Sequence, residues 1–176
     1  DDGSGGGFTI DAGVVSNCVV AANRSRGGAG VVANGGLVTH CVVQGNRTGV
    51  GGTANGGGGI TLSGGTIRNT LVYGHSHANT GAGINGGAST ANEIVNCTVV
   101  DNTNTTATVG GGVVLGGGSA VNVVAARNVR SGGTPDDVRS ADLARYTYSC
   151  APELTSGTGN TTAVPLFADV AVRDYR

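Results

Sequence analysis

The stretch GGGFTIDAGVVSNCVVAANRS at residues 5–25 returns in altered form as GGGGITLSGGTIRNTLVYGHS at residues 56–76. Both stretches contain a glycine run, a short apolar run, a further glycine, a second apolar run and then Asn or His. Self-similarity at a regular interval is the signature of a repeat architecture. We therefore interpret the chain as a series of equivalent structural units.

Two columns of polar residues mark the units. The closing position of the unit recurs at spacings of 23, 29, 27 and 26 residues, and a second polar position lies six residues before each closing position. Asn tolerates the left-handed backbone of tight corners. Stacked Asn side chains can also satisfy turn groups that would otherwise be buried unpaired. The closing column is Asn23, Asn46, His75, Asn102 and Asn128, and the second column is Asn17, His40, Asn69, Asn96 and Asn122.

Short apolar triplets between glycine clusters indicate the fold. Such segments suit a solenoid in which each unit stacks on the next at about 4.8 Å, forming parallel sheets around a narrow core. The glycine clusters are expected at corners, where positive φ is needed. We predict an all-β, right-handed parallel β-helix of about five to seven coils with a C-terminal strand and loop cap. Residues 1–130 are expected to form the coils, and residues 131–176 an irregular loop and closing segment of the same domain.

The repeat frame GGG-apolar-x-apolar-x-GG-x-apolar-x-NC-x-apolar-x-x-N resembles the right-handed parallel β-helix repeats of secreted and cell-surface bacterial proteins. These include polymorphic outer-membrane-protein-like passengers. The resemblance covers about residues 5–130, and the tail at residues 146–176 resembles the segment that often ends such β-helices. It implies the fold and an extracellular or cell-surface location. It implies little about activity, because this fold hosts lyases, hydrolases, adhesins and structural fibres alike.

Composition restricts the classes of function. A formal net charge of −1 gives no electrostatic basis for nucleic-acid binding. No apolar run reaches the about 18 residues of a membrane span. The chain starts at Asp1 without a signal peptide, so we expect a processed product or a piece of something longer. No acidic residue lies between Asp11 and Glu93, whereas β-helix enzymes that cleave polysaccharides need clustered carboxylates. The sequence predicts a protein without enzymatic activity or cofactor.

Two groups of residues are candidate metal ligands. Asp136, Asp137 and Asp142 lie in the loop GGTPDDVRSADLARY at residues 132–146, which is either a solvated turn after Pro135 or a Ca²⁺ site. His75 and His77 would share one face of a strand and could hold a metal there. Alternatively, His75 replaces Asn as the turn residue of the closing column.

The modification state of two further groups can be anticipated. Asn104 in NTNTTAT (residues 102–108) is the best-placed N-x-S/T acceptor for a glycan, because it is expected in an inserted loop. Cys18 and Cys41 should stack in adjacent coils with parallel Cβ directions, so we expect buried thiols and no disulfide. Cys97 is expected to behave in the same way.

One face of the predicted solenoid is unusually apolar. If the residues Val20, Val43, Val72, Val99 and Ala125 point inward, their outward neighbours form an apolar stripe, which consists of Val19, Val42, Leu71, Thr98 and Val124. A contiguous exposed apolar patch usually marks a contact. Two structures could cover this stripe, namely a second subunit or the chain's own tail at residues 164–172.

We expect an extracellular structural or adhesive β-helix that self-associates, either as a filament subunit or as part of a surface stalk. The apolar stripe and strand edges exposed at uncapped solenoid ends favour this interpretation. The alternative is a carbohydrate-binding or polysaccharide-degrading module, with glycans as partners. Ice binding needs regular Thr rows, and the outer column Thr9, Val32, Thr61, Asn85 and Val114 is too irregular for it.

Overall fold

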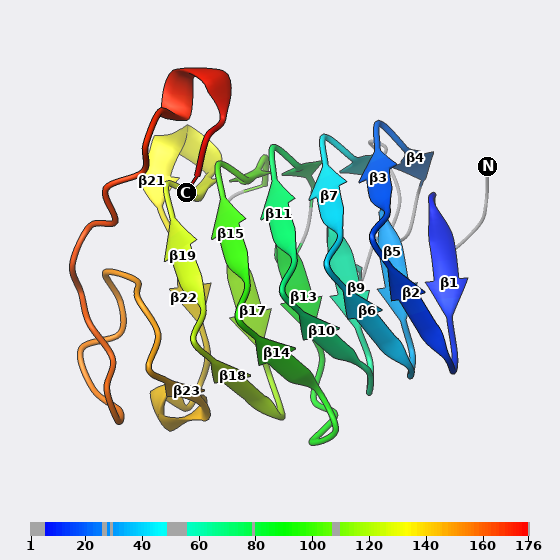
Figure 1. The fold of residues 1–176 in the computed structure, drawn as a ribbon. Coiled ribbons are helices and arrows are strands. Elements are labelled where there is room, and N and C mark those ends of the chain that lie inside the picture. Colours follow the sequence, from blue (N-terminus) through cyan, green and yellow to red (C-terminus); the bar gives the residue numbers. More distant parts are fainter. Residues whose placement is uncertain are drawn as a thin grey trace.

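The protein forms a parallel β-solenoid of about five turns (Figure 1). The computed structural model describes residues 6–25, 28, 30–48, 56–78, 80–106 and 110–175. Within these residues every turn contributes four short strands, one to each of four stacked sheets. The repeat units predicted from the glycine and asparagine spacing are thus the coils of the solenoid.

Sheets 1 and 2 form two sides of the solenoid. Sheet 1 consists of β1 (Phe8–Ile10), β5 (Val31–Ala33), β9 (Ile60–Leu62), β13 (Ile84–Gly86), β17 (Val113–Leu115) and β22 (Val138–Arg139). Sheet 2 consists of β2 (Val14–Ser16), β6 (Leu37–Thr39), β10 (Thr66–Arg68), β14 (Glu93–Val95), β18 (Ser119–Val121) and β23 (Tyr146–Thr147).

Sheets 3 and 4 complete each coil. Sheet 3 consists of β3 (Val19–Ala21), β7 (Val42–Gln44), β11 (Leu71–Tyr73), β15 (Thr98–Val100) and β19 (Val124–Ala126). Sheet 4 consists of β4 (Arg24–Ser25), β8 (Arg47–Thr48), β12 (Ser76–His77), β16 (Thr103–Asn104), β20 (Val129–Arg130) and β21 (Thr134–Pro135). Three short 3₁₀ helices follow the complete coils, and they are η1 (Ser131–Gly133), η2 (Leu143–Arg145) and η3 (Val170–Val172).

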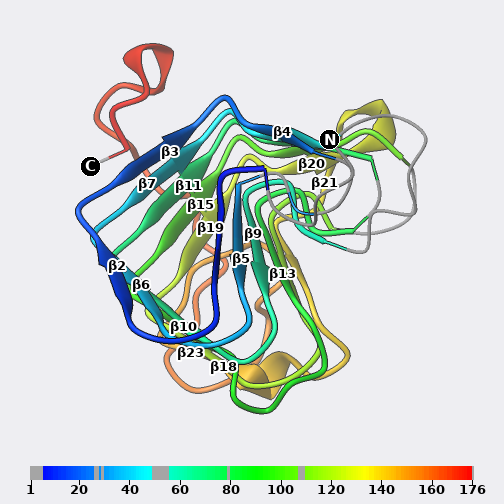
Figure 2. The ribbon, with the colours of Figure 1, turned by 90° about the vertical axis from the view of Figure 1, so that its right-hand side faces the viewer.

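The solenoid is right-handed, as predicted. Figure 2 shows the coils from the N-terminal end, and the chain runs clockwise through β1, β2, β3 and β4 as it recedes from the viewer. Neighbouring coils pair in register; Val20 lies beside Val43, for example, and Val72 beside Val99. In-register stacking keeps each column of equivalent residues on one face through the whole stack.

The core is a narrow column of branched aliphatic side chains. The predicted inward residues of sheet 3 are all buried, and Val43, Val72, Val99 and Ala125 have no exposed surface. Sheets 1 and 2 supply Ile and Leu side chains such as Ile60, Leu62, Ile67 and Ile94, which are equally buried. Each coil alone would leave these side chains in water, so burial depends on the coil above and the coil below.

One glycine of each cluster is required by packing and not by its backbone angle. A Cβ at Gly59 would lie 2.6 Å from the carbonyl oxygen of Gly83 and 2.7 Å from Nε2 of His75. These five glycines, termed the glycine column, precede the first strand of each coil without positive φ, and they are Gly7, Gly30, Gly59, Gly83 and Gly112. The expected positive φ does occur at loop glycines such as Gly81 and Gly110. The glycine column instead makes room for the closing residue of its own coil.

The repeat continues past the predicted boundary at residue 130. β22 pairs with β17, β23 pairs with β18, and Cys150 bridges to Val124, so residues 138–150 form an incomplete sixth coil. β21 instead folds back antiparallel on β20, which ends sheet 4. Residues 158–163 then lie along the outer edge of the sixth coil through bonds such as Tyr148 N–H to Thr158 O. The C-terminal end of the solenoid is therefore covered (Figure 1).

Candidate interaction surfaces

The closing column forms a continuous hydrogen-bonded ladder, here termed the inner ladder. The backbone N–H of Asn23 donates to Oδ1 of Asn46 at 2.9 Å, and the N–H of Asn46 donates to Nδ1 of His75 at 3.0 Å. His75 N–H donates to Oδ1 of Asn102 at 3.0 Å, and Asn102 N–H donates to Oδ1 of Asn128 at 3.1 Å. The last four of these side chains are buried. The sequence prediction of a ladder at these five positions agrees with the structure.

Side-chain donors of the inner ladder point back toward the preceding coil. Asn46 Nδ2 donates to the carbonyl oxygen of Val20 at 3.0 Å, and Asn128 Nδ2 donates to that of Val99 at 2.8 Å. Each inner coil thus supplies a backbone N–H and a carbonyl oxygen to the ladder residue of the next coil. The ladder therefore satisfies corner groups that have no place in the sheets.

His75 occupies the ladder as a neutral imidazole. Its Nδ1 accepts the Asn46 N–H, so the ring proton lies on Nε2, which donates to the Val43 carbonyl oxygen at 3.0 Å. Burial lowers its pKa to about 4, despite the opposing effect of the backbone bonds to Val43 and Asn46. Burial also lowers the pKa of His77 to about 4, and its Nδ1 lies 2.6 Å from Oγ1 of Thr48. Both ring nitrogens of His75 and Nδ1 of His77 have structural partners, whereas Nε2 of His77 is buried without one. A metal shared between the two rings would have to displace the bonds of His75.

Asp137 ends the inner ladder. Its Oδ1 accepts the backbone N–H of Asn128 at 2.7 Å and Nδ2 of Asn128 at 2.8 Å, while its own N–H donates to Oε1 of Glu153 at 2.9 Å. Burial raises the pKa of the Asp137 carboxyl, and the bonds from Asn128 partly offset this effect. A carboxylate accepts hydrogen bonds but donates none, so the series of donors stops here.

The three candidate calcium ligands have separate structural roles. Asp137 ends the inner ladder, and Asp142 Oδ1 accepts the N–H of Ala144 at the start of η2. Asp136 Oδ2 lies 3.8 Å from both Arg130 Nε and Arg139 Nη1. Within the described part of the chain no cluster of His, Cys, Asp and Glu could hold a metal ion. The solvated-turn interpretation is also inadequate, because Asp136 and Asp137 are buried.

The second polar column lies at the corner between sheets 2 and 3. Its members all adopt positive φ, from 47° at Asn69 to 54° at Asn17. Asn96 Nδ2 donates to Oδ1 of Asn69, and Asn122 Nδ2 donates to Oδ1 of Asn96 at 2.9 Å. Tyr148, with a φ of 51°, takes the equivalent position in the sixth coil. This second ladder is solvent-exposed, unlike the inner ladder.

The cysteines next to the second column are free thiols in the structure. Cys41 and Cys97 are buried as expected, and each Sγ donates to the carbonyl oxygen two residues earlier. Cys18 makes the same bond to Ser16 but is exposed, because no described coil lies above it. The expectation of a buried thiol is therefore wrong for Cys18. Whether a reagent can reach a given thiol therefore depends on the position of its coil within the stack.

Asn104 does not lie in an open loop. It is the second residue of β16, its side chain has no exposed surface, and its Oδ1 accepts the N–H of Thr106 at 3.0 Å. The expectation of an accessible glycan acceptor at this position is therefore wrong in its physical premise. An oligosaccharide on Nδ2 could not be accommodated without opening the coil.

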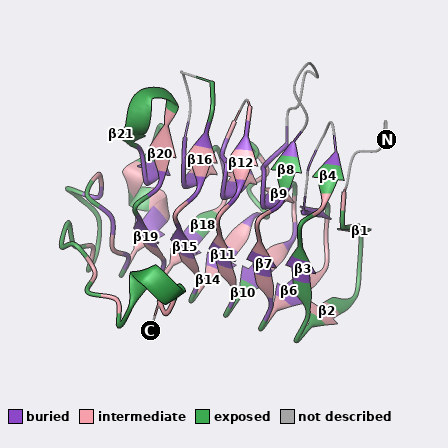
Figure 3. Cartoon of the chain, turned by 90° about the horizontal axis from the view of Figure 1, so that it is seen from above, coloured by how far each residue is buried: buried purple, intermediate pink, exposed green. Residues whose placement is uncertain are grey.

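The apolar stripe is a true column. Val19, Val42, Leu71, Thr98 and Val124 lie side by side across sheet 3 through in-register pairing. Exposure falls along it, because Val19 is 65% exposed and the other four are intermediate (Figure 3). The stripe is therefore most accessible at the N-terminal end of the stack.

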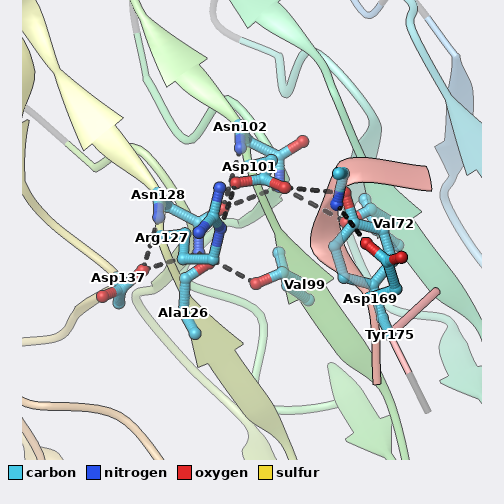
Figure 4. A network of polar contacts seen from close by, with 11 residues as sticks. Val72, Val99, Asp101, Asn102, Ala126, Arg127, Asn128, Asp137, Asp169 and Tyr175 are labelled. Atoms are coloured by element: carbon cyan, nitrogen blue, oxygen red, sulfur yellow. Dashed lines mark hydrogen bonds and ion pairs between the residues drawn. The ribbon is translucent and has the colours of Figure 1, made fainter. Parts of the chain in front are cut away.

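The C-terminal tail packs on the neighbouring outward-facing column of sheet 3, which contains Tyr73 and Val100, and not on the stripe. Tyr175 lies 5.5 Å from Tyr73 between ring centroids, and its hydroxyl donates to Asp101 Oδ2 at 2.6 Å. Arg127 Nε donates to the other oxygen of Asp101 at 2.7 Å, which joins tail, stack and inner ladder in one polar network (Figure 4). The outward-facing Val100 of this column is fully buried. Of the two possible covers of the stripe, the chain's own tail is therefore not the one that the structure shows there.

The tail also forms one wall of an apolar cavity. The cavity has a volume of about 370 Å³ and lies between the last complete coil and the segment Val164–Phe167. Ala126, Val129 and Pro135 form the opposite wall. Leu166, at the edge of the cavity, is 96% exposed.

The N-terminal end of the solenoid is open in the described residues. β1, β2, β3 and β4 pair only with the second coil, and their opposite edges have no described partner. A hollow of about 390 Å³ lies at this end, and its lining includes Phe8, Val15, Val20 and Asn23. The end face therefore combines unpaired strand edges with an accessible part of the core.

Comparisons with family models, with curated proteins and with solved structures each gave no match for this chain. The described residues contain no helix with the length and apolarity needed to cross a membrane.

Proposed function

We propose that this protein is a non-enzymatic, extracellular or cell-surface structural element whose role is to associate with other protein chains, as an adhesive or stalk-forming solenoid. The observation that carries this proposal is the asymmetry of the stack. The C-terminal end is covered by the chain itself, whereas the N-terminal end, as far as the described residues show, presents four strand edges and a hollow lined by both apolar and polar groups. Exposed edges and apolar surface together favour association.

The contacts of the acidic side chains support a structural role. Glu93 bonds to Arg68 and Thr66, and Asp101 bonds to Arg127 and Tyr175. Asp137 is held in the inner ladder. A glycosidase needs two carboxylates flanking a groove, one of them available as an acid. These carboxylates are instead used to join coils, which favours the structural function over polysaccharide cleavage.

The structure favours a stalk segment over a head-to-tail filament. A filament of identical subunits needs a C-terminal end that complements the N-terminal end. Residues 158–163 and β21 occupy the C-terminal edges of sheets 3 and 4, so a copy would have to displace them. We therefore expect association to use the N-terminal end and the accessible first part of the stripe.

The test is a concentration series followed by light scattering and negative-stain electron microscopy. Val19→Lys places a charge beside the open edge, and lysine on an edge strand opposes strand pairing. Val172→Lys is the matched control, because Val172 is 74% exposed but lies in the tail. We expect association of the natural chain and of Val172→Lys, and its loss in Val19→Lys. A natural chain that stays monomeric at the highest concentration, together with release of reducing ends from polysaccharide, would overturn the proposal.

A further inference from the structure

The first coil carries the residues of an inner coil and not those of a terminal one. Terminal repeats of solenoids normally present a polar outer face that ends the stack. Here Val15 and Val20 face the core like Val38 and Val43 of the second coil, but nothing described lies above them. At the other end, by contrast, the buried Tyr146 fills the core and Asp137 ends the ladder.

Asn23 has an acceptor, Oδ1, and one of its two Nδ2–H donors without a described partner, because its other Nδ2–H donates to the second coil. In the second coil, Asn46 Oδ1 accepts the Asn23 N–H, and Asn46 Nδ2 donates to the Val20 carbonyl oxygen. Asn23 Nδ2 also donates to Asn46 Oδ1 at 3.0 Å, but no described group donates to Asn23 Oδ1. The missing partners are a backbone N–H and a carbonyl oxygen, placed as an inner coil places them.

The strand edges of the first coil repeat this pattern. Leu37, Val42 and Arg47 donate their N–H groups to the first coil, to the carbonyl oxygens of Gly13, Cys18 and Asn23. The equivalent donors Val14 and Val19 lie on the open side. Val14 and Val19 are 64% and 65% exposed, and Cys18 is exposed where Cys41 and Cys97 are buried. The end face is thus complementary to a coil in both its backbone and its side chains.

A second copy of the intact chain does not supply the required groups at its C-terminal end. The ladder there ends in the Asp137 carboxylate, and the Asp137 N–H is occupied by Glu153. The adjoining edge of sheet 4 is closed by β21, whose Pro135 has no N–H to donate. The required partner is therefore a coil whose outgoing edge is free.

We propose that the N-terminal end face binds a further right-handed β-coil that donates a backbone N–H to Asn23 Oδ1, accepts from Asn23 Nδ2 and fills the hollow with small aliphatic side chains. These are the features of this chain's own inner coils. The inference rests on the proposed structural function and names the chemistry of the partner.

The experiment supplies such a coil and measures the protection of Cys18. A copy of residues 8–30 replaces residues 1–7, so that Phe8 follows the copied Gly30 as it now follows Gly7. Cys150→Ser is introduced throughout, and the cysteine of the copied segment is replaced by serine. Cys18 is then the only accessible thiol of the parent, because Cys41 and Cys97 are buried. A matched control carries the same added residues in scrambled order.

We expect the copied coil to slow the reaction of Cys18 with a thiol reagent at least tenfold, and the scrambled segment to leave the rate unchanged. Asn23→Leu in the extended chain should restore part of the rate. Cys18 reacting at the parental rate in the extended chain would overturn the inference, provided circular dichroism shows the solenoid folded. If Cys18 is protected but the natural chain never associates, the inference stands and the proposed association of copies fails. If copies of the natural chain associate while Cys18 of the extended chain stays reactive, the proposed association stands and the inference fails.

Discussion

The two ends of this solenoid differ in how the stack of coils ends. At the C-terminal end the chain reverses direction in β21, places Tyr146 in the core and ends the inner ladder on Asp137. At the N-terminal end, the first described coil has the same residue types as the coils inside the stack. A parallel solenoid needs a specific structure to stop, because every coil exposes edges and core to the next one. Only one end of the described chain has such a structure.

The largest expected difference between the interior and the open end concerns the inner ladder. Asn102→Leu leaves the buried His75 N–H and the Val72 carbonyl oxygen without partners, because Asn102 now serves both. Each buried group left unpaired costs about 1–3 kcal/mol, so we expect a loss of about 4 kcal/mol in the free energy of unfolding. Asn23→Leu, at the half-buried first position, should cost about 1 kcal/mol. Urea unfolding followed by circular dichroism measures both, and equal losses would contradict the proposed difference between the positions.

The second prediction concerns pH. The folded-state pKa of His75 lies at about 4, below its ordinary value of 6.5, so folding favours the neutral ring. Its contribution is therefore complete above pH 6.5 and is lost as the pH falls from 6.5 to about 4. The shift corresponds to about 3 kcal/mol of stability, as an order of magnitude. His75→Asn, which restores the usual ladder residue, should keep stability at pH 7.5 and reduce the loss at pH 4.5.

Other groups titrate in the same range and define the necessary comparison. The pKa of His77 is also lowered, so it adds a loss of the same sign. The pKa values of Asp137 and Glu153 are raised by burial, so their protonation stabilises the fold as the pH falls. The difference between the natural chain and His75→Asn isolates the contribution of His75. Parallel stability curves for the two proteins between pH 7.5 and 4.5 would refute it.

The third prediction compares glycines. Gly59→Ala brings a Cβ to 2.6 Å from the Gly83 carbonyl oxygen and 2.6 Å from His75 Cδ2, so we expect a loss of about 2 kcal/mol from overpacking. Gly7→Ala makes a similar contact with Gly30, but the first coil can shift outward, so its cost should be about half as large. Gly87→Ala is the control, because its nearest contact is 4.0 Å away and its φ is not positive. Melting temperatures give the order, and a Gly87→Ala variant as destabilised as Gly59→Ala would contradict the packing explanation, because at Gly87 the added Cβ has room and the lower entropy of the unfolded chain favours folding.

Most of the stack could be predicted from the sequence because in-register stacking converts spacing into position. Residues at intervals of 23–29 came to lie directly over one another, which fixed both the inner ladder and the apolar stripe. The ladder's last step escaped prediction because Asp137 follows Asn128 by 9 residues, across the β20–β21 hairpin. A repeat spacing of 26 does continue from Val123 to Ser149, and this signal could have revealed the sixth coil.

The remaining errors share a physical cause. Asn104 lies two residues after the closing residue Asn102, and sequence alone did not show that a strand of sheet 4 includes it. The path of the tail depends on single long-range contacts, such as that from Tyr175 to Asp101 over 74 residues. Contacts of this kind leave no periodic pattern. The glycine column was located correctly, but its reason was steric room beside the ladder and not backbone angle.

The smallest predicted effect concerns the C-terminal tail. It tests whether the tail is attached to the solenoid as strongly as the sixth coil is. Tyr175→Phe removes the hydrogen bond to Asp101 but keeps the ring contacts with Tyr73 and Phe167. Asp101 keeps its bond from Arg127, and the site is partly exposed, so the cost should be below about 1 kcal/mol. The tail should nevertheless detach more often, and trypsin should cleave after Arg173 several times faster. Unchanged cleavage would mean that ring packing alone holds the tail, whereas a large fall in global stability would mean that the tail is part of the cooperative stack.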